Sequence, residues 1–261
     1  MNTINTLISF TKSLRYFIES MLYSKKEMKN VENLKDICKG NTVVIVGNGP
    51  SLNKTPLDEF SECTSIGMNK IDMIFDRVSW RPNFIVAENN LVVKQHWEKM
   101  RSHGVKCILS WKTRWFIPKK NRDSFSYYLS LASNEFSTDI QNGFGTSSTV
   151  TYSALQLAYY MGAKNVVLLG IDHSFATKGK PLTYERREGP DNNHFDPNYF
   201  ASGGYWGVPD LDDSEIGYMK AKKAYENDGR KIYDATVGGK LDLFEKISIS
   251  SALQIIKNES D

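Results

Sequence analysis

The sequence has few cysteines, no long uninterrupted apolar run and no excess of either charge. Its three cysteines, Cys38, Cys63 and Cys107, are odd in number and widely spaced, which argues against a disulfide framework or a zinc site. Cys63 and Cys107 lie in apolar, strand-like runs, so we expect buried thiols in a reducing, cytoplasmic compartment. The net charge is only +3 and no basic block occurs, which argues against a nucleic-acid partner.

The N-terminal segment could be mistaken for a targeting signal. Its apolar residues recur at helical spacing, but Lys12, Arg15 and Glu19 interrupt them. This pattern is typical of an amphipathic helix and not of a signal peptide or a membrane span. We therefore expect a helix with a linker over residues 1–40 and one nucleotide-binding α/β domain over residues 41–261.

The amphipathic helix has two possible partners. We expect it to pack on its own domain or on a second subunit, which would make a homo-oligomer. The alternative is peripheral contact with the inner face of an anionic membrane, aided by Lys25, Lys26 and Lys29.

From residue 41 onward, short β-branched runs alternate with helical stretches. The expected strands cover 42–46, 64–68, 83–87, 105–110, 165–170 and 230–235, and the expected helices cover 92–104, 147–163 and 213–229. This alternation predicts an α/β, Rossmann-like fold with a mainly parallel sheet. Residues 173–210 have no period and are rich in Gly, Pro, Asn and aromatics, so we expect a lid-like loop over the carboxyl edge of the sheet.

The first expected strand runs into the turn "GNGPS" at residues 47–51. Ligands of open α/β sheets lie beyond the carboxyl ends of the strands, and a Gly-rich first turn often holds phosphate. Gly47 and Gly49 would permit unusual backbone angles and the close approach of a ligand. Ser51 would offer its hydroxyl, and the N–H groups after it would face an anion. The turn lacks the Gly-Lys-Ser/Thr of a P-loop and the third glycine and acid of a dinucleotide site; a tight turn that binds nothing is the alternative.

Asparagines follow three expected strands, at Asn48, Asn69 and Asn89/Asn90. A single asparagine after a strand is usually a turn former. Three at one sheet edge favour a polar site, because a carboxamide can donate and accept hydrogen bonds with a base, a ribose or a phosphate.

Four blocks carry a resemblance to known proteins: "VVIVGNGPSL", "IGMNKIDMIFD", "GTSSTVTYSALQLAYYMGAKNVVLLGID" and "NNHF". They occur in the same order as matching blocks of the small bacterial sialyltransferases. They also resemble the wider group of motility accessory factors and 6-hydroxymethylpterin diphosphokinase MptE-like proteins. The resemblance covers roughly residues 42–240. It implies a modified GT-A fold and inverting transfer of a CMP-activated acidic sugar to a cell-surface glycan, such as lipopolysaccharide or capsule, without a metal or other cofactor.

The resemblance also implies roles for individual residues. His194 would be the general base, and the residues that contact the donor or its nucleotide would be Asn48, Asn69, Asn89, Thr146, Ser147, Gly170, Ile171 and Asp172. Two positions depart from the sialyltransferases: Ser174 replaces a phosphate-binding tyrosine, and Phe144 replaces an arginine. Tyr184 could supply the hydroxyl, and Arg186 or Arg187 the positive charge, although "ERRE" is equally compatible with a solvated charge cluster.

Histidine suits the base role, because its ordinary pKa of about 6.5 lets it accept a proton near pH 7. His96 and His103 fall on an expected surface helix and should be solvated. His173 could contact the donor or be a structural hydrogen bonder. Asp172 beside it would bind a ribose hydroxyl, activate His173 or cap a turn, and we favour the ribose.

The sequence is compatible with three functions. Glycosyl transfer leads; Mg²⁺-dependent pyrophosphate transfer from ATP to 6-hydroxymethylpterin and a non-catalytic nucleotide-binding module are the alternatives. Pyrophosphate transfer would need acidic metal ligands near the phosphates, where this chain has asparagines. The "DLDD" at 210–213 precedes an expected helix, so we interpret it as a helix cap and not as a metal site.

Overall fold

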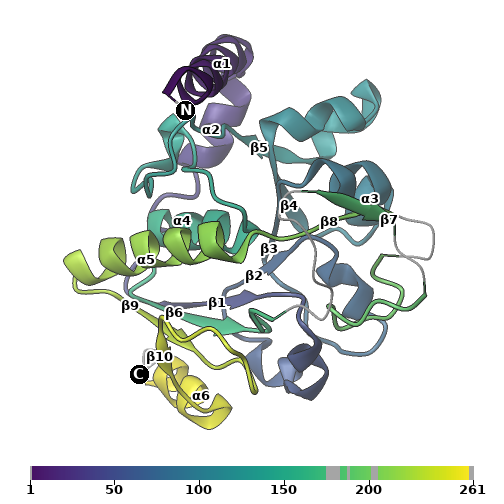
Figure 1. Cartoon of the computed structure of the whole chain (residues 1–261). Coiled ribbons are helices and arrows are strands. Elements are labelled where there is room, and N and C mark those ends of the chain that lie inside the picture. Colours follow the sequence, from purple (N-terminus) through teal and green to yellow (C-terminus); the bar gives the residue numbers. More distant parts are fainter. Residues whose placement is uncertain (1, 175–182, 187–188, 201–204, 259–261) are drawn as a thin grey trace.

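The computed structural model describes residues 2–174, 183–186, 189–200 and 205–258, with the backbone alone for residues 2–10 and 12. It shows an α/β fold of the Rossmann-like kind, in which helices cover both faces of a single large sheet (Figure 1). No described helix is both long enough and apolar enough to cross a membrane.

The sheet has eight strands in the order β10-β9-β6-β1-β2-β3-β4-β5, and all neighbouring pairs are parallel. The strands are β1 (Thr42–Val46), β2 (Ser65–Met68), β3 (Phe84–Ala87), β4 (Lys106–Ser110), β5 (Ser126–Tyr128), β6 (Asn165–Leu169), β9 (Lys231–Asp234) and β10 (Glu245–Lys246). The chain builds outward from β1 to β5 and then returns to the other side of β1 with β6. The strand order therefore reverses at β1, which leaves a crevice beyond the carboxyl ends of β1 and β6.

Strand β1 shows why the sheet is buried on both faces. All five of its residues are buried, and alternate side chains enter opposite cores: Val43 and Ile45 one, Val44 and Val46 the other. A continuous β-branched run is typical of such a strand, because both of its faces need apolar side chains.

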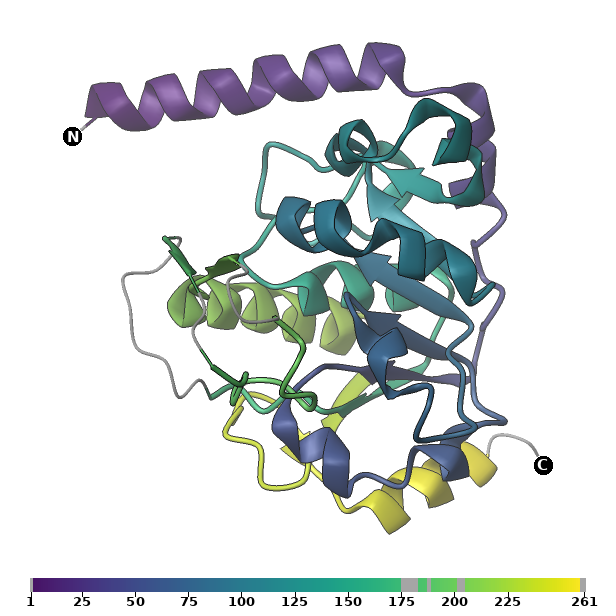
Figure 2. The ribbon, with the colours of Figure 1, turned by 90° about the vertical axis from the view of Figure 1, so that its right-hand side faces the viewer.

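The helices divide between the two cores. The first core holds buried residues of α2 (Lys25–Glu32), α4 (Val150–Tyr160) and α5 (Leu211–Asn227), and the second holds those of α3 (Asn90–Ser102) and α6 (Ile249–Lys257). Helix α1 (Asn2–Leu22) runs along the outside of the body (Figure 2).

The expected strands and helices are confirmed to within a few residues, whereas β5, β10 and α6 were not predicted. Helix α4 begins three residues later than expected, and it is capped by Thr149, whose side chain accepts from the N–H of Thr151. Cys38 and Cys107 are buried as expected, but Cys63 is only half-buried.

The N-terminal segment contributes more to the core than a linker would. Val31, Leu34 and Cys38 are each 2–3% exposed and belong to the first core. The hydrophobic core therefore begins before residue 41.

The described part of the expected lid contains a small hairpin. Strand β7 (Tyr184–Arg186) pairs antiparallel with β8 (Tyr205–Gly207), apart from the main sheet. The segment 189–200 is held against the turn after β1, because the N–H of Phe195 donates to the Asn48 carbonyl over 2.9 Å.

Candidate active site

A cavity of about 190 Å³ lies beyond the carboxyl ends of β1, β2 and β6, at the point where the strand order reverses. The starts of α4 and α5 and the 193–194 segment complete its wall. The predicted site residues that line it are Gly47, Asn48, Gly49, Asn69, Gly170, Ile171, Asp172, His173 and His194. The structure thus brings together most of the residues that the sequence assigned to a nucleotide-sugar donor.

The glycines after β1 allow two turns to touch. Neither Gly47 nor Gly49 has a positive φ, so the unusual backbone angles expected there are absent. Instead, a Cβ at Gly47 would collide with the Gly170 carbonyl, and a Cβ at Gly49 would collide with the Asp172 carboxylate. The close approach that these glycines permit is therefore between the turn after β1 and the turn after β6, and not between a turn and a ligand.

Asp172 holds this contact together. Its Oδ1 accepts from the Ser51 N–H over 3.0 Å, and its Oδ2 accepts from the Ser51 hydroxyl over 2.6 Å. The Ser51 hydroxyl that the sequence offered to an anion, and the Ser51 N–H, therefore bind a carboxylate of the chain itself. Ser51 is 5% exposed and does not line the cavity.

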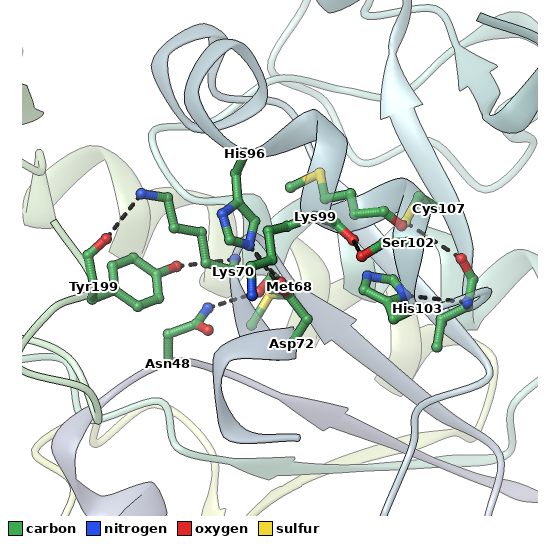
Figure 3. Close-up of polar contacts among 12 residues, drawn as sticks. Asn48, Met68, Lys70, Asp72, His96, Lys99, Ser102, His103, Cys107 and Tyr199 are labelled. Carbon is green, nitrogen blue, oxygen red and sulfur yellow. Dashed lines mark hydrogen bonds and ion pairs between the residues drawn. The ribbon is translucent and has the colours of Figure 1, made fainter. Parts of the chain in front are cut away.

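Two asparagines that line the cavity each have a buried side-chain oxygen without a partner among the described residues. The Asn48 Nδ2 donates to the Met68 carbonyl over 2.9 Å (Figure 3). The Oδ1 atoms of Asn48 and Asn69 are buried and accept no hydrogen bond from the described residues. Because both residues line the cavity, these two acceptors are candidates to bind a ligand with hydrogen-bond donors.

His194 carries the group best suited to proton transfer. Its Nδ1 lies 2.9 Å from the Oδ2 of Asp191, whose side chain is 1% exposed. The other oxygen of Asp191 accepts from the Asn193 N–H over 2.8 Å. A carboxylate partner keeps the proton on Nδ1, so the lone pair of the neutral imidazole lies on Nε2.

An aromatic platform supports the histidine ring. His194 stacks on Tyr199 with 3.9 Å between ring centroids and 1° between the planes, and Phe200 packs edge-on against it. Tyr199 is itself fixed by Lys70: its hydroxyl accepts from the Lys70 N–H, and its carbonyl accepts from the Lys70 Nζ over 2.9 Å (Figure 3).

Lys70 is a buried cation next to this platform. It is 6% exposed, and burial lowers the pKa of its ammonium to about 8, although Asp72 and Asp191 oppose the shift. Its Nζ also lies 4.6 Å from the centroid of the Phe200 ring. Lys70 was not predicted as part of the site.

His173 has a structural partner. Its Nε2 lies 2.9 Å from the Oε1 of Glu215 on α5, and its ring meets Tyr218 edge-on. Its φ of 50° places it in the left-handed region. It lines the cavity as expected, and the contact with Glu215 fits the structural role that the sequence left open.

Several predicted residues lie away from this cavity. Asn89 is exposed and caps α3, since its Oδ1 accepts from the N–H groups of Leu91 and Val92. Tyr184 is 66% exposed on the β7–β8 hairpin, and Arg186 is exposed on the same strand. Neither residue lines the cavity. Arg187 lies outside the described residues.

Thr146 and Ser147 line a second cavity of about 440 Å³. Ser148 lines both cavities, so the two are neighbours. The wall of the second cavity is polar and includes Asp210 and Asp213.

The "DLDD" motif acts as the expected cap. Asp210 caps α5 by accepting from the Asp213 N–H over 3.0 Å, and Asp213 accepts from the Ser148 N–H. Among the described residues, no group of three His, Cys, Asp or Glu side chains could hold a metal ion.

The surface histidines differ from expectation. The His96 side chain is 11% exposed and lies 2.8 Å from the Asp72 carboxylate, and His103 is half-buried. Both face inward because α3 packs against the second core, which the sequence pattern of this helix did not reveal.

Asp191, Tyr199 and Lys70 are the site residues that sequence reasoning missed. A carboxylate three residues before His194 in "DNNH" was a usable signal for a histidine–carboxylate pair. The contact between Lys70 and Tyr199 spans 129 residues, and no local pattern could have indicated it.

Comparison with known proteins supports the fold. A family model described as 6-hydroxymethylpterin diphosphokinase MptE-like matches residues 19–178, which is more than half of the chain. No curated protein sequence matches. The structure resembles the MAf glycosyltransferase from Magnetospirillum magneticum AMB-1, with 16% identity, a TM-score of 0.52 and 90% of this chain covered. This chain spans 41% of that protein's length.

A second solved structure is the sialyltransferase CstII from Campylobacter jejuni, in complex with the substrate analogue cytidine-5'-monophosphate. It is 17% identical, with a TM-score of 0.49, and the match covers 80% of this chain and 86% of that one. At 16% identity, the match to the MAf glycosyltransferase shows a shared fold alone.

Proposed function

The chain belongs to the 6-hydroxymethylpterin diphosphokinase MptE-like family, and we propose that it is a glycosyltransferase with a nucleotide-activated sugar as donor. One observation carries the proposal: His194, paired with Asp191, lines the same cavity as Asn48 and Asn69, whose side-chain oxygens have no partner among the described residues. A base and a set of acceptors for a polar ligand thus occupy one crevice of the sheet.

In this mechanism His194 acts as the general base. Its Nε2 takes the proton from an acceptor hydroxyl while the hydroxyl oxygen attacks the anomeric carbon of the donor. The bond between that carbon and the phosphate oxygen breaks, and the electron pair leaves with the nucleotide. Attack from the face opposite the phosphate inverts the anomeric centre. Asp191 keeps the imidazole in the required tautomer and stabilises the imidazolium that forms.

We propose a CMP-linked acidic sugar as the donor. The oxygens of Asn48 and Asn69 would accept from the amino group of a base or from sugar hydroxyls. The described lining contains no Lys or Arg, so neutral donors and the His173 imidazole would face the phosphate. The roles of Tyr184, Arg186 and Arg187 in holding the phosphate stay predictions.

The second cavity is our proposed site for the glycan acceptor. It adjoins the first at Ser148, and hydroxyls, a carboxamide and the Asp210 and Asp213 carboxylates line it. Such groups suit the hydroxyls of a sugar. An acceptor bound there would extend into the cavity that holds His194.

Pyrophosphate transfer is the second candidate, because the description of the matched family names a diphosphokinase. Mg²⁺ bound beside the phosphates prefers carboxylate ligands. Asp172 is the one carboxylate in the described lining of the first cavity, and both of its oxygens already accept from Ser51. The described lining therefore fits this chemistry poorly.

The proposal is tested by release of CMP from CMP-N-acetylneuraminate in the presence of a panel of glycans. We expect release that depends on a glycan, that is lost in His194→Ala and that persists in Asn192→Ala, a change at an exposed residue of the same loop. CMP binding without turnover under all conditions would instead identify a non-catalytic nucleotide-binding module.

A further inference from the structure

Helix α1 exposes one continuous apolar face. Its residues are spaced three, four, seven and eight positions from the first, which places them on one side of a helix. They are Leu14, Phe17, Ile18, Met21 and Leu22, each between 48% and 71% exposed. Single exposed apolar residues are common, but a contiguous set marks an interaction surface. We call this set the α1 stripe.

The body of the protein holds the helix through other residues. The Tyr16 hydroxyl donates to the Asn142 carbonyl over 2.8 Å. Just beyond the helix, the Tyr23 hydroxyl donates to the Tyr127 carbonyl over 2.6 Å. Figure 2 shows α1 along the outer edge of the molecule, with its N-terminal part reaching past the body. The α1 stripe is therefore left without a partner inside the described chain.

The surface around this helix is positively charged. Lys25, Lys29, Lys119 and Lys120 are exposed. The last two lie in a short helical segment that is joined to α2 by the ion pair between Lys26 and Asp123, 2.7 Å long.

The carboxylates in the segments that carry these lysines and the α1 stripe are paired or buried. Within residues 11–30 and 111–125 they are Glu19, Glu27 and Asp123. Glu19 lies 3.9 Å from Arg15, Glu27 is buried and accepts from the Tyr127 N–H, and Asp123 binds Lys26. An exposed apolar face with unpaired lysines beside it suits an anionic surface.

We propose that the α1 stripe docks on an anionic membrane, with the helix in the plane of the interface. The apolar side chains enter the boundary between headgroups and acyl chains, and the lysines meet lipid phosphates. A second copy of the chain is the less favourable occupant, because pairing two α1 stripes would cover the apolar side chains but would not by itself give the exposed lysines an anionic partner. This inference goes beyond the proposed function and does not depend on it.

The test is sedimentation of the full chain with vesicles of phosphatidylglycerol and phosphatidylcholine, compared with vesicles of phosphatidylcholine alone. We expect binding to the anionic vesicles that weakens as salt increases. The double variant Phe17→Ser/Met21→Ser should bind the anionic vesicles at least about tenfold more weakly than the wild type. Lys25→Gln/Lys29→Gln should lose part of the preference for anionic lipid.

Met219→Ser is the matched control. Met219 is 49% exposed on α5, so the change removes an exposed apolar side chain elsewhere and should leave vesicle binding unchanged. Equal melting temperatures would confirm that the variants fold.

Two results would overturn the inference. One is no binding to either vesicle type. The other is a dimer in sedimentation velocity without lipid that Phe17→Ser/Met21→Ser converts to a monomer, which would assign the α1 stripe to a second copy.

Discussion

The His194 ring lies flat on the Tyr199 ring, with 3.9 Å between centroids and 1° between planes. The ring is also held at its edge, since Nδ1 lies 2.9 Å from Asp191. Two restraints from different directions fix both the orientation and the tautomer of the imidazole. A base that is oriented before the substrate binds needs little rearrangement in the transition state.

Removing the base should abolish turnover and spare binding. His194→Ala should lower the rate of CMP release by roughly 10²-fold or more, because general-base catalysis is lost, while affinity for CMP stays nearly unchanged. Asp191→Asn should lower the rate by at least about tenfold, since an amide no longer secures the tautomer. Initial rates and calorimetry on the same preparations check both points. Normal turnover by His194→Ala would show that the base is another group.

Asn48 should act on binding and not on the chemical step. Asn48→Ala removes the unpartnered Oδ1 and the hydrogen bond to the Met68 carbonyl, so nucleotide affinity should fall by about tenfold. Asn90→Ala is the control, because Asn90 is an exposed residue at the same edge of the sheet. Equal nucleotide affinities of the two variants would show that Asn48 does not bind the nucleotide.

Gly49 should tolerate no side chain while Asp172 is present. Gly49→Ala places a Cβ against the Asp172 carboxylate and should destabilise the fold by about 1–3 kcal/mol. The double variant Gly49→Ala/Asp172→Ala should be less destabilised than the sum of the single changes. Gly207→Ala is the control, because the nearest atom to its Cβ would be 3.6 Å away. Additive effects in urea denaturation would contradict the proposed contact.

Lys70 should make stability depend on pH. Its folded-state pKa is about 8, below the ordinary value of 10.5, because of burial. Between these two pKa values the unfolded chain binds more protons, so the contribution of Lys70 to stability rises with pH. The unfolding free energy of the wild type minus that of Lys70→Met should therefore rise by about 2 kcal/mol from about pH 7.5 to about pH 9.5. A difference that stays constant over this range would show that Lys70 does not titrate there.

Local patterns predicted most of the sheet and the edge at which the site lies. Runs such as "TVVIV" are β-branched and apolar throughout, because β1 is buried on both faces. Strand β5 is short and its sequence, "SYY", lacks this composition. It joins the sheet through pairing with β4, which is tertiary information.

The candidate site was predicted in part. Residues that follow strands, such as Asn48, Asn69 and His173, line the cavity as expected, because parallel strands end at one edge of the sheet. Asn89 also follows a strand, but its side chain caps α3. The platform of Tyr199 and Lys70 depends on a contact between distant segments, which spacing along the chain does not encode.

Calorimetric titration tests whether the cavity beside His194 holds a nucleotide-sugar donor. The purified chain is titrated with CMP, UDP, GDP and ATP, each with and without Mg²⁺. We expect preferential binding of CMP that does not depend on Mg²⁺ and that weakens in Asn48→Ala. Binding of ATP alone, and only with Mg²⁺, would contradict glycosyl transfer and favour pyrophosphate transfer.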